Sequence, residues 1–333
     1  MYEWDDDWLA RTVEEAIDPD LPIVDPHHHL WERAGFLRYV LADLHADTGA
    51  GHRVEKTVFV ECAWDYRTDG PATLRPVGET EAVVRVAEVS ASHGAEIAGI
   101  VGFADLTLGE GVDEVLTAHV EAGRGRFRGI RHATAFDADP RIRRTHTLPT
   151  VQLMADPAFR AGVARLPAHG LSFDAWLYHP QVPELTALAR AVPECTFVLD
   201  HLGGMLGTGP YEGRRAEILE QWHLDMADLA TCPNVVVKLG GIGMVVFGLG
   251  FEARPEPPTS ADLAASWTEP ILATIERFGV DRCMFESNFP VDKMSCSYVV
   301  LWNAFKRIAD LAGASQAERA ALFHDTATRV YRL

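Results

Sequence analysis

The sequence predicts an α/β fold, a distorted TIM-like (β/α)8 barrel, and three observations lead to this prediction. The 333 residues are 47% apolar and 23% charged, which is enough apolar surface for a large core. Eight short apolar runs alternate with segments of helical periodicity, as in proteins built from strand–helix repeats. The glycine-rich stretch "HLGGMLGTG" (201–209) comes late and lacks the dinucleotide-binding spacing, which disfavours the alternative, a doubly wound open sheet.

The predicted strands are continuous apolar runs, the pattern of strands that are buried on both faces of a parallel sheet. In chain order they are 22–29, 56–64, 96–105, 127–134, 171–178, 195–203, 234–243 and 282–290. Helical periodicity with an acidic or capping residue near its start marks 79–94, 111–123, 156–170 and 182–193. We expect an acidic N-terminal extension over 1–20 and a single barrel domain over 21–333, with helices at its C-terminal end.

The charge balance restricts the partners. Lys and Arg number 30 against 48 Asp and Glu, a formal net charge of −18, so the average surface field repels nucleic acids and anionic membranes. No apolar run approaches the roughly 20 residues that cross a bilayer, and the N-terminus lacks a signal-peptide pattern. Five scattered cysteines without a CxxC pair fit reduced core residues. We expect a cytoplasmic protein with a small-molecule substrate, no nucleic-acid or membrane partner, and a homodimeric assembly.

Polar residues close each predicted strand. In a barrel of this kind the active site lies at the carboxyl ends of the strands, so these residues are the candidates for function. They are His27, His29, Glu61, Asp105, Arg131, His132, Asp174, His179, His201, Lys238, Glu286, Asn288 and Asp292.

Three consecutive histidines end the first strand, in "VDPHHHLW". Residues i and i+2 of a strand point the same way, about 6.5 Å apart, so His27 and His29 can converge on one divalent ion. A third ligand from another strand would leave a coordination position open for water. The alternative is a hydrogen-bonded strand end without a metal. His201, at another strand end, favours a site, and His28 is expected to point away and fix the strand end by hydrogen bonding.

Further motifs carry a family resemblance. They are "RGIRH" (128–132), "LSFDAWLYHP" (171–180), "VLDHLGG" (198–204), "VVVKLGG" (235–241), "MFESNFPVD" (284–292) and "FHDTATRVYRL" (323–333). With "VDPHHHLW", they resemble the amidohydrolase superfamily, in the branch that contains sugar-lactone lactonases, pyrone-dicarboxylate lactonases and decarboxylases. The likeness runs from about residue 20 to the end of the chain. It implies a distorted TIM barrel that hydrolyses a carbonyl compound, most often a lactone.

The resemblance also implies a metal site. His27, His29 and His201 match histidines that hold a divalent ion in metal-using relatives, whereas the pyrone-dicarboxylate lactonases use the equivalent histidines without one. We expect a divalent metal, zinc first and manganese as the alternative, with a metal-free mechanism left open.

One position departs from the family. The last strand usually ends in an aspartate that binds metal and transfers a proton, but here the residue is Asn288. An amide does not accept a proton near neutral pH, although its oxygen can bind a metal or accept a hydrogen bond. Asp292, Glu286 and Glu61 are the candidates for the base, and a metal-bound hydroxide is the fourth possibility.

Other strand-end residues are candidates for binding substrate. Arg131 can grip a carboxylate or polarise a carbonyl, with an internal salt bridge as the alternative. Lys238 must face a partner or the pocket, because unpaired burial of a charge is costly, and Asp174 is a candidate partner. The predicted substrate-binding residues are Arg131, His132, His179, Lys238, Asn288, Trp64 and Trp176.

Two long loops remain open in function. The stretch 137–149 adds Arg141, Arg143 and Arg144, which fits a site for an anionic substrate or a solvated loop equally well. Residues 243–260 are long enough for a lid or binding loop, or for a subunit contact. The remaining histidines, His146 among them, are treated as surface or core residues.

Three functions compete. The first is a lactone hydrolase with His27, His29 and His201 as metal ligands. Its predicted catalytic residues are Asp292, Glu286, Glu61, Arg131 and His201. The second is a metal-dependent decarboxylase or other lyase on the same fold, and the third is a barrel that binds a ligand without catalysis.

Overall fold

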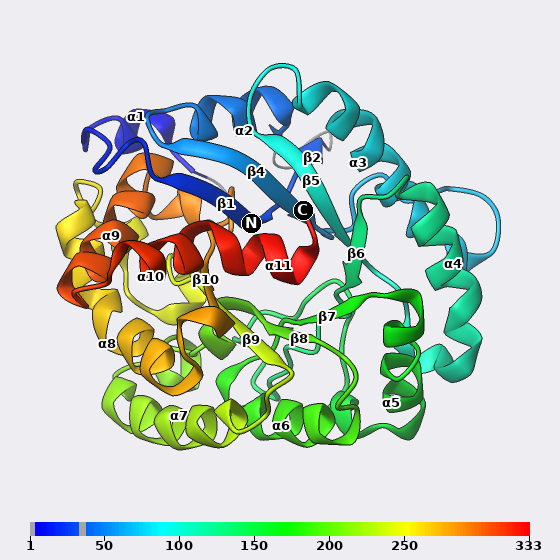
Figure 1. Cartoon of the computed structure of the whole chain (residues 1–333). Coiled ribbons are helices and arrows are strands. Elements are labelled where there is room, and N and C mark those ends of the chain that lie inside the picture. Colours follow the sequence, from blue (N-terminus) through cyan, green and yellow to red (C-terminus); the bar gives the residue numbers. More distant parts are fainter. Residues whose placement is uncertain (1–3, 33–37) are drawn as a thin grey trace.

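The computed structural model describes residues 4–32 and 38–333, and its main feature is a barrel of eight parallel strands (Figure 1). Neighbouring strands pair in the order β1, β4, β5, β6, β7, β8, β9, β10. The barrel closes where β10 returns to β1, because His28 forms a parallel bridge with Phe289 and the His29 amide donates to the Phe289 carbonyl at 2.8 Å. The predicted barrel is therefore confirmed.

All eight barrel strands lie at the predicted places. Their bounds are Pro22–His28 (β1), Arg53–Val60 (β4), Glu96–Gly102 (β5), Phe127–Ile130 (β6), Ser172–Ala175 (β7), Phe197–Leu199 (β8), Val235–Leu239 (β9) and Cys283–Phe285 (β10). Most end before the apolar run does, so the polar residues at the end of each run lie on the loops just after the strands. A short antiparallel pair was not predicted: Trp31–Glu32 (β2) and Arg38–Tyr39 (β3) follow the histidine stretch.

Helices surround the barrel in Figure 1. Between the strands lie Leu41–Thr48 (α2), Val77–Ser90 (α3), Asp113–Ala122 (α4), Pro157–Val163 (α5), Val182–Ala191 (α6), Arg215–Ala230 (α7) and Ser260–Phe278 (α8). Before and after the barrel lie Asp6–Leu9 (α1), Tyr298–Leu311 (α9), Gln316–Ala320 (α10) and Thr326–Tyr331 (α11). The predicted helix 156–170 is shorter than expected, because after α5 the chain continues as a 3-10 turn, Leu166–His169, that ends at left-handed Gly170.

The amino-terminal end of the barrel is filled by the C-terminal helix. Ala327, Val330 and Tyr331 of α11 pack in one cluster with the inward valines of the strands, among them Val24 and Val58. The Tyr331 hydroxyl reaches into the barrel and donates to Asp174 Oδ2 at 2.5 Å. This end is therefore closed, and polar chemistry is restricted to the opposite end. Within the described parts of the chain, no helix combines the length and apolar character needed to cross a bilayer.

Candidate active site

A cavity of about 540 Å³ lies over the carboxyl ends of the strands. Its lining combines histidines, aromatic walls and arginines with an apolar side. The lining residues are His29, Trp31, Glu61, Cys62, Ala63, Arg131, Ala133, Arg141, Arg143, Thr145, His146, Trp176, Tyr178, His201, Thr208, Met244, Val245, Val246, Asn288, Val291 and Met294. A larger hollow of about 770 Å³ lies between residues 4–8 and 252–254. It contains no histidine, so the first cavity is the candidate site.

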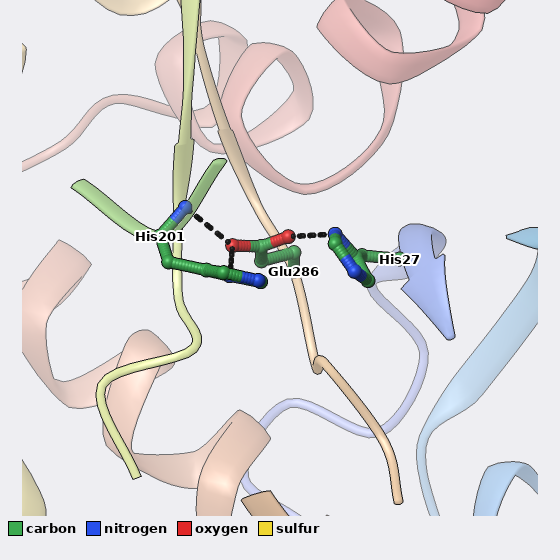
Figure 2. A group of neighbouring side chains, drawn as sticks. All are labelled: His27, His201 and Glu286. Carbon is green, nitrogen blue, oxygen red and sulfur yellow. Dashed lines mark hydrogen bonds and ion pairs between the residues drawn. The ribbon is translucent and has the colours of Figure 1, made fainter. Parts of the chain in front are cut away.

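Glu286, just after β10, holds two of the predicted histidines (Figure 2). Its carboxylate lies between the two rings, with Oε2 2.8 Å from His27 Nδ1 and Oε1 2.6 Å from His201 Nδ1. Oε1 also accepts from the His201 amide at 3.2 Å. Burial raises the pKa of Glu286, but the two adjacent histidines outweigh burial and lower it to about 2. The ionised carboxylate therefore accepts a hydrogen bond from Nδ1 of each ring.

His29 is held in a similar way by the backbone. Its Nδ1 lies 2.7 Å from the Val60 carbonyl oxygen, which can only accept, so the proton of the neutral ring is on Nδ1. Burial and the charge of Arg131 lower the pKa of His29 well below its usual range. In all three histidines Nδ1 is used for a hydrogen bond, the kind of contact that orients metal-binding histidines.

The three rings lie close together. The His27 ring centroid is 5.0 Å from that of His29 and 4.6 Å from that of His201. Ligand atoms of His27, His201 and Glu286 lie within 4.8 Å of one another. Arg131 is a neighbour of this group, because its Nη1 lies 3.3 Å from His27 Nε2. The imidazole nitrogens and carboxylate oxygens of His27, His201 and Glu286 are ligand types that fit a divalent ion such as zinc.

Beneath the histidines lies a buried charge cluster. Lys238 Nζ lies 2.8 Å from Asp174 Oδ2, 3.0 Å from Asp200 Oδ1 and 3.2 Å from His27 Nδ1. Burial lowers the pKa of Lys238, but Asp174 and Asp200 outweigh burial and raise it above its usual value. Lys238 therefore faces Asp174, the partner that was expected for it, as well as Asp200. It does not line the cavity.

Asn288 lines the cavity, and Asp292 lies behind it. The Asn288 amide donates from Nδ2 to Asp292 Oδ1 at 2.8 Å, and the Gly243 amide donates to Asp292 Oδ2 at 2.8 Å. Because Nδ2 donates to Asp292, the side-chain carbonyl oxygen of Asn288 is the atom that can accept a hydrogen bond from a molecule in the cavity. Burial raises the pKa of Asp292 to about 7. Of the three predicted bases, Glu286 holds the histidines, Asp292 holds Asn288, and Glu61 lines the cavity.

Glu61 connects Arg131 with His146, a histidine that was predicted to be a surface or core residue. Its Oε1 accepts from Arg131 Nε at 2.8 Å, and its Oε2 lies 3.0 Å from His146 Nε2. The Arg131 Nη2 also donates to the Glu61 carbonyl oxygen. Burial raises the pKa of Glu61, but His146 and Arg131 outweigh burial and lower it to about 2. Glu61 is therefore an anion between two cationic groups, and a weak base.

Besides Lys238, three further predicted substrate-binding residues do not line this cavity. His132 Nδ1 accepts from the Leu106 amide at 3.2 Å, and His179 Nδ1 accepts from the Leu206 amide at 3.2 Å. The Trp64 amide donates to Glu79 Oε1 at 2.7 Å. These contacts hold loops next to the cavity, whereas Trp176 lines it, with its ring centroid 4.9 Å from that of His201.

The expectation that His28 fixes the strand end by hydrogen bonding is wrong. His28 points away from the site, but neither ring nitrogen has a hydrogen-bond partner among the described residues. Its ring packs edge-on against Phe59, 5.9 Å between centroids, and burial lowers its pKa to about 3. The strand end is fixed by the backbone pairing with Phe289.

Asp200 and His146 belong to the site but are not among the residues predicted for it. Asp200 directly precedes His201 in "LDH", and its position at a strand end was the signal that could have found it. His146 comes from the loop between β6 and α5, and no periodic pattern places an irregular loop over a barrel. Its flanking arginines, Arg141 and Arg143, also line the cavity.

Comparison with known proteins gives consistent matches. A family model described as amidohydrolase matches residues 24–333. The chain is 35% identical over 332 residues to the uncharacterized protein y4mH of Sinorhizobium fredii (94% of this chain, 99% of the relative). It is 29% identical over 325 residues to the L-fucono-1,5-lactonase of Burkholderia multivorans (93% and 96%). A crystal structure of a Burkholderia multivorans amidohydrolase with bound zinc matches with a TM-score of 0.72 at 27% identity (93% and 99%).

Proposed function

Because the chain belongs to the amidohydrolase family, we propose that it is a hydrolase that opens lactones by adding water to the ring carbonyl. The observation that carries this proposal is the set of three histidines whose Nδ1 atoms are held by Glu286 and the Val60 carbonyl. The similarity to L-fucono-1,5-lactonases supports the reaction type.

His27, His29 and His201 are the residues that would hold a divalent metal, zinc first. The zinc in the related amidohydrolase supports this assignment. The buried charge also supports it, because the carboxylates around the site outnumber the buried cations Lys238 and Arg131. These carboxylates are Glu286, Asp200, Asp174 and Glu61. A bound ion would polarise the lactone carbonyl and lower the pKa of water.

The other residues of the site bind and orient the lactone. Arg131 is held by Glu61 and lies beside His27, where its guanidinium can donate to a carbonyl or carboxylate oxygen. The carbonyl oxygen of Asn288 can accept a hydrogen bond from the attacking water. Trp31 and Trp176 line the cavity and can exclude bulk water from the ring.

The cavity lining supports an anionic substrate with an apolar part. Arg141 and Arg143 line the cavity together with the apolar residues Met244, Val245 and Val246. The Arg141 guanidinium donates two hydrogen bonds to Asp139, and a substrate carboxylate can compete for an arginine with the same geometry. We therefore propose that a lactone with a carboxylate is preferred over a neutral polyhydroxylated sugar lactone.

The test is a panel of lactones, with and without a carboxylate, assayed by acid release in a pH-indicator assay, together with metal analysis of the purified protein. We expect bound zinc or manganese in the wild type and ring opening of at least one lactone. His201→Asn should lower metal content and reduce activity by more than about 100-fold, an effect that exceeds the 10–100-fold typical of residues behind the ligands. His223→Asn is the matched control, since His223 pairs with Glu269 on outer helices.

Each outcome of this test has a meaning. Carbon dioxide release from carboxylates without any lactone opening would replace the hydrolase with the lyase alternative. Absence of metal, with chelators leaving activity unchanged, would overturn the metal assignment. If no lactone is opened, the proposed function fails.

A further inference from the structure

We propose that His146 is a catalytic residue of this site, the general acid that protonates the ring oxygen as the lactone opens. The inference rests on the proposed function.

Glu61 orients the imidazole. Its Oε2 lies 3.0 Å from His146 Nε2, while Arg131 holds the other carboxylate oxygen and the Glu61 carbonyl. Glu61 is fully buried, whereas the His146 side chain is 36% exposed and lines the cavity. A buried carboxylate that holds one ring nitrogen leaves the other nitrogen, Nδ1, for proton exchange with a bound molecule.

The loop that carries His146 is tied to the barrel on both sides. After it, Thr147 Oγ1 donates to the Ala133 carbonyl at 2.8 Å. Before it, the Tyr178 hydroxyl donates to the Arg143 carbonyl at 2.6 Å, and the Phe136 amide donates to Gln181 Oε1 at 2.9 Å. These contacts hold the loop over the cavity, so His146 has a defined position relative to the site.

The charges around His146 favour its protonated form. Glu61 faces it from the end of β4, Arg131 and His132 from the end of β6, and Glu79 from α3. Phe103 packs edge-on against the ring at 6.0 Å between centroids. Burial lowers the pKa of His146, but Glu61 outweighs burial and raises it above its usual value.

Other polar groups of the cavity are poor proton donors. The Nδ1 protons of His29 and His201 are held by acceptors, and the arginines do not release protons near neutral pH. Asn288 is an amide, and Asp292 lies behind it. Among the described cavity residues, His146 is the group whose charge and exposure suit proton donation.

The oxygen of water bonds to the carbonyl carbon, and one of its protons is released to solvent. The bond between that carbon and the ring oxygen breaks, its electron pair goes to the ring oxygen, and this oxygen takes the proton from His146 Nδ1. Solvent reprotonates the imidazole, and ionisation of the product carboxyl group leaves a hydroxycarboxylate and one proton in total.

The test uses two six-membered lactones that differ in their leaving group. δ-Valerolactone releases an alkoxide, which needs protonation, and dihydrocoumarin releases a phenoxide, which is stable without it. We expect His146→Asn to lower kcat for the alkyl lactone by about 10²–10⁴-fold, the size of a general acid contribution, and for the aryl lactone by less than about 10-fold. His223→Asn, which removes another histidine paired with a glutamate, should change neither.

A second measurement does not depend on substrate. NMR titration of the His146 ring should give a pKa above that of an ordinary histidine, and Glu61→Gln should lower it because the facing negative charge is removed. The high-pH limb of kcat for the alkyl lactone should move to lower pH in the same variant. His146→Gln repeats the test if the asparagine variant is poorly folded.

The outcomes separate the two proposals. If the wild type opens no lactone, the proposed function fails and the role of His146 falls with it. If the wild type opens both lactones and His146→Asn lowers both equally, or lowers neither, only the role of His146 is overturned. A His146 pKa at or below the ordinary value would also overturn it.

Discussion

At the scale of single residues, the buried charge of Lys238 supports the site from below. Its ammonium group is fully buried and contacts Asp174, Asp200 and His27, while the Tyr331 hydroxyl donates to the same Asp174 oxygen. A buried ion pair contributes little net free energy over apolar residues, but removing one partner leaves uncompensated charge. The cluster therefore fixes the position of His27 more than it adds to stability.

Lys238→Met should be strongly destabilising. It leaves Asp174 and Asp200 buried without this cation, and we expect a loss of about 3–5 kcal/mol in the free energy of unfolding, measured by urea denaturation. Lys56→Met on β4, where the lysine is only partly buried, is the control and should cost less than about 1 kcal/mol. Equal losses in the two variants would show that the buried contacts of Lys238 have no special weight.

At the scale of elements, His119 joins three parts of the barrel wall. It lies on α4, and its Nδ1 lies 2.8 Å from the Thr80 hydroxyl of α3. Its Nε2 donates to the Phe103 carbonyl after β5 at 2.9 Å, and its ring stacks on Phe127 of β6 at 4.7 Å between centroids. Burial lowers the pKa of His119 to about 4, so the folded protein keeps this ring neutral.

This helix contact predicts acid sensitivity. The unfolded chain takes up a proton at His119 below its usual pKa of about 6.5, whereas the folded chain does so only near 4. Stability from this residue is therefore complete above pH 6.5 and is lost as the pH falls towards 4. Between pH 8 and pH 5 the wild type should lose about 2 kcal/mol more than His119→Gln in urea denaturation. The exposed control His93→Gln should match the wild type, and parallel curves for all three would contradict this prediction.

At the scale of the whole molecule, the N-terminal segment joins the loop beside the cavity to the outer helices. Trp8 Nε1 donates to the Arg254 carbonyl at 3.0 Å, and Thr12 Oγ1 donates to the Pro257 carbonyl at 2.9 Å. Glu14 accepts from the Ser260 amide at 2.7 Å and from Asn303 Nδ2 of α9 at 2.9 Å. The same loop provides the apolar side of the cavity at residues 244–246.

Deleting residues 1–17 should weaken both the fold and substrate binding. Loss of buried Leu9 and of these hydrogen bonds should cost at least about 3 kcal/mol, and lower the melting temperature by at least roughly 4 °C. The KM for the best lactone should rise because the loop loses its support, with kcat less affected. Val13→Ser, at an 84% exposed position, serves as the control, and a deletion variant that melts with the wild type would refute the supporting role.

The sequence predicted more of the barrel than of the site. The apolar runs located all eight strands, and the polar residues at their ends include Glu61, Arg131, His201 and Asn288 of the cavity lining. The predicted binding residues His132, His179 and Trp64 instead hold neighbouring loops. Side chains alternate between two opposite directions only within a strand. Beyond the strand end, the direction in which a side chain points depends on how each loop turns. The roles of the predicted catalytic residues and metal ligands stay predictions.

The sequence by itself determined the barrel, the paired histidines His27 and His29, and the missing aspartate at Asn288, because apolar periodicity and local motifs are properties of neighbouring residues. Only the tertiary structure decided that Glu286 lies between His27 and His201, and that Glu61 holds His146 over the cavity. The residues in these contacts are far apart along the chain: Glu61 and His146, for example, are separated by 85 positions (146 minus 61). Their contact follows from the closure of the barrel and the fixing of its loops, which no local pattern encodes.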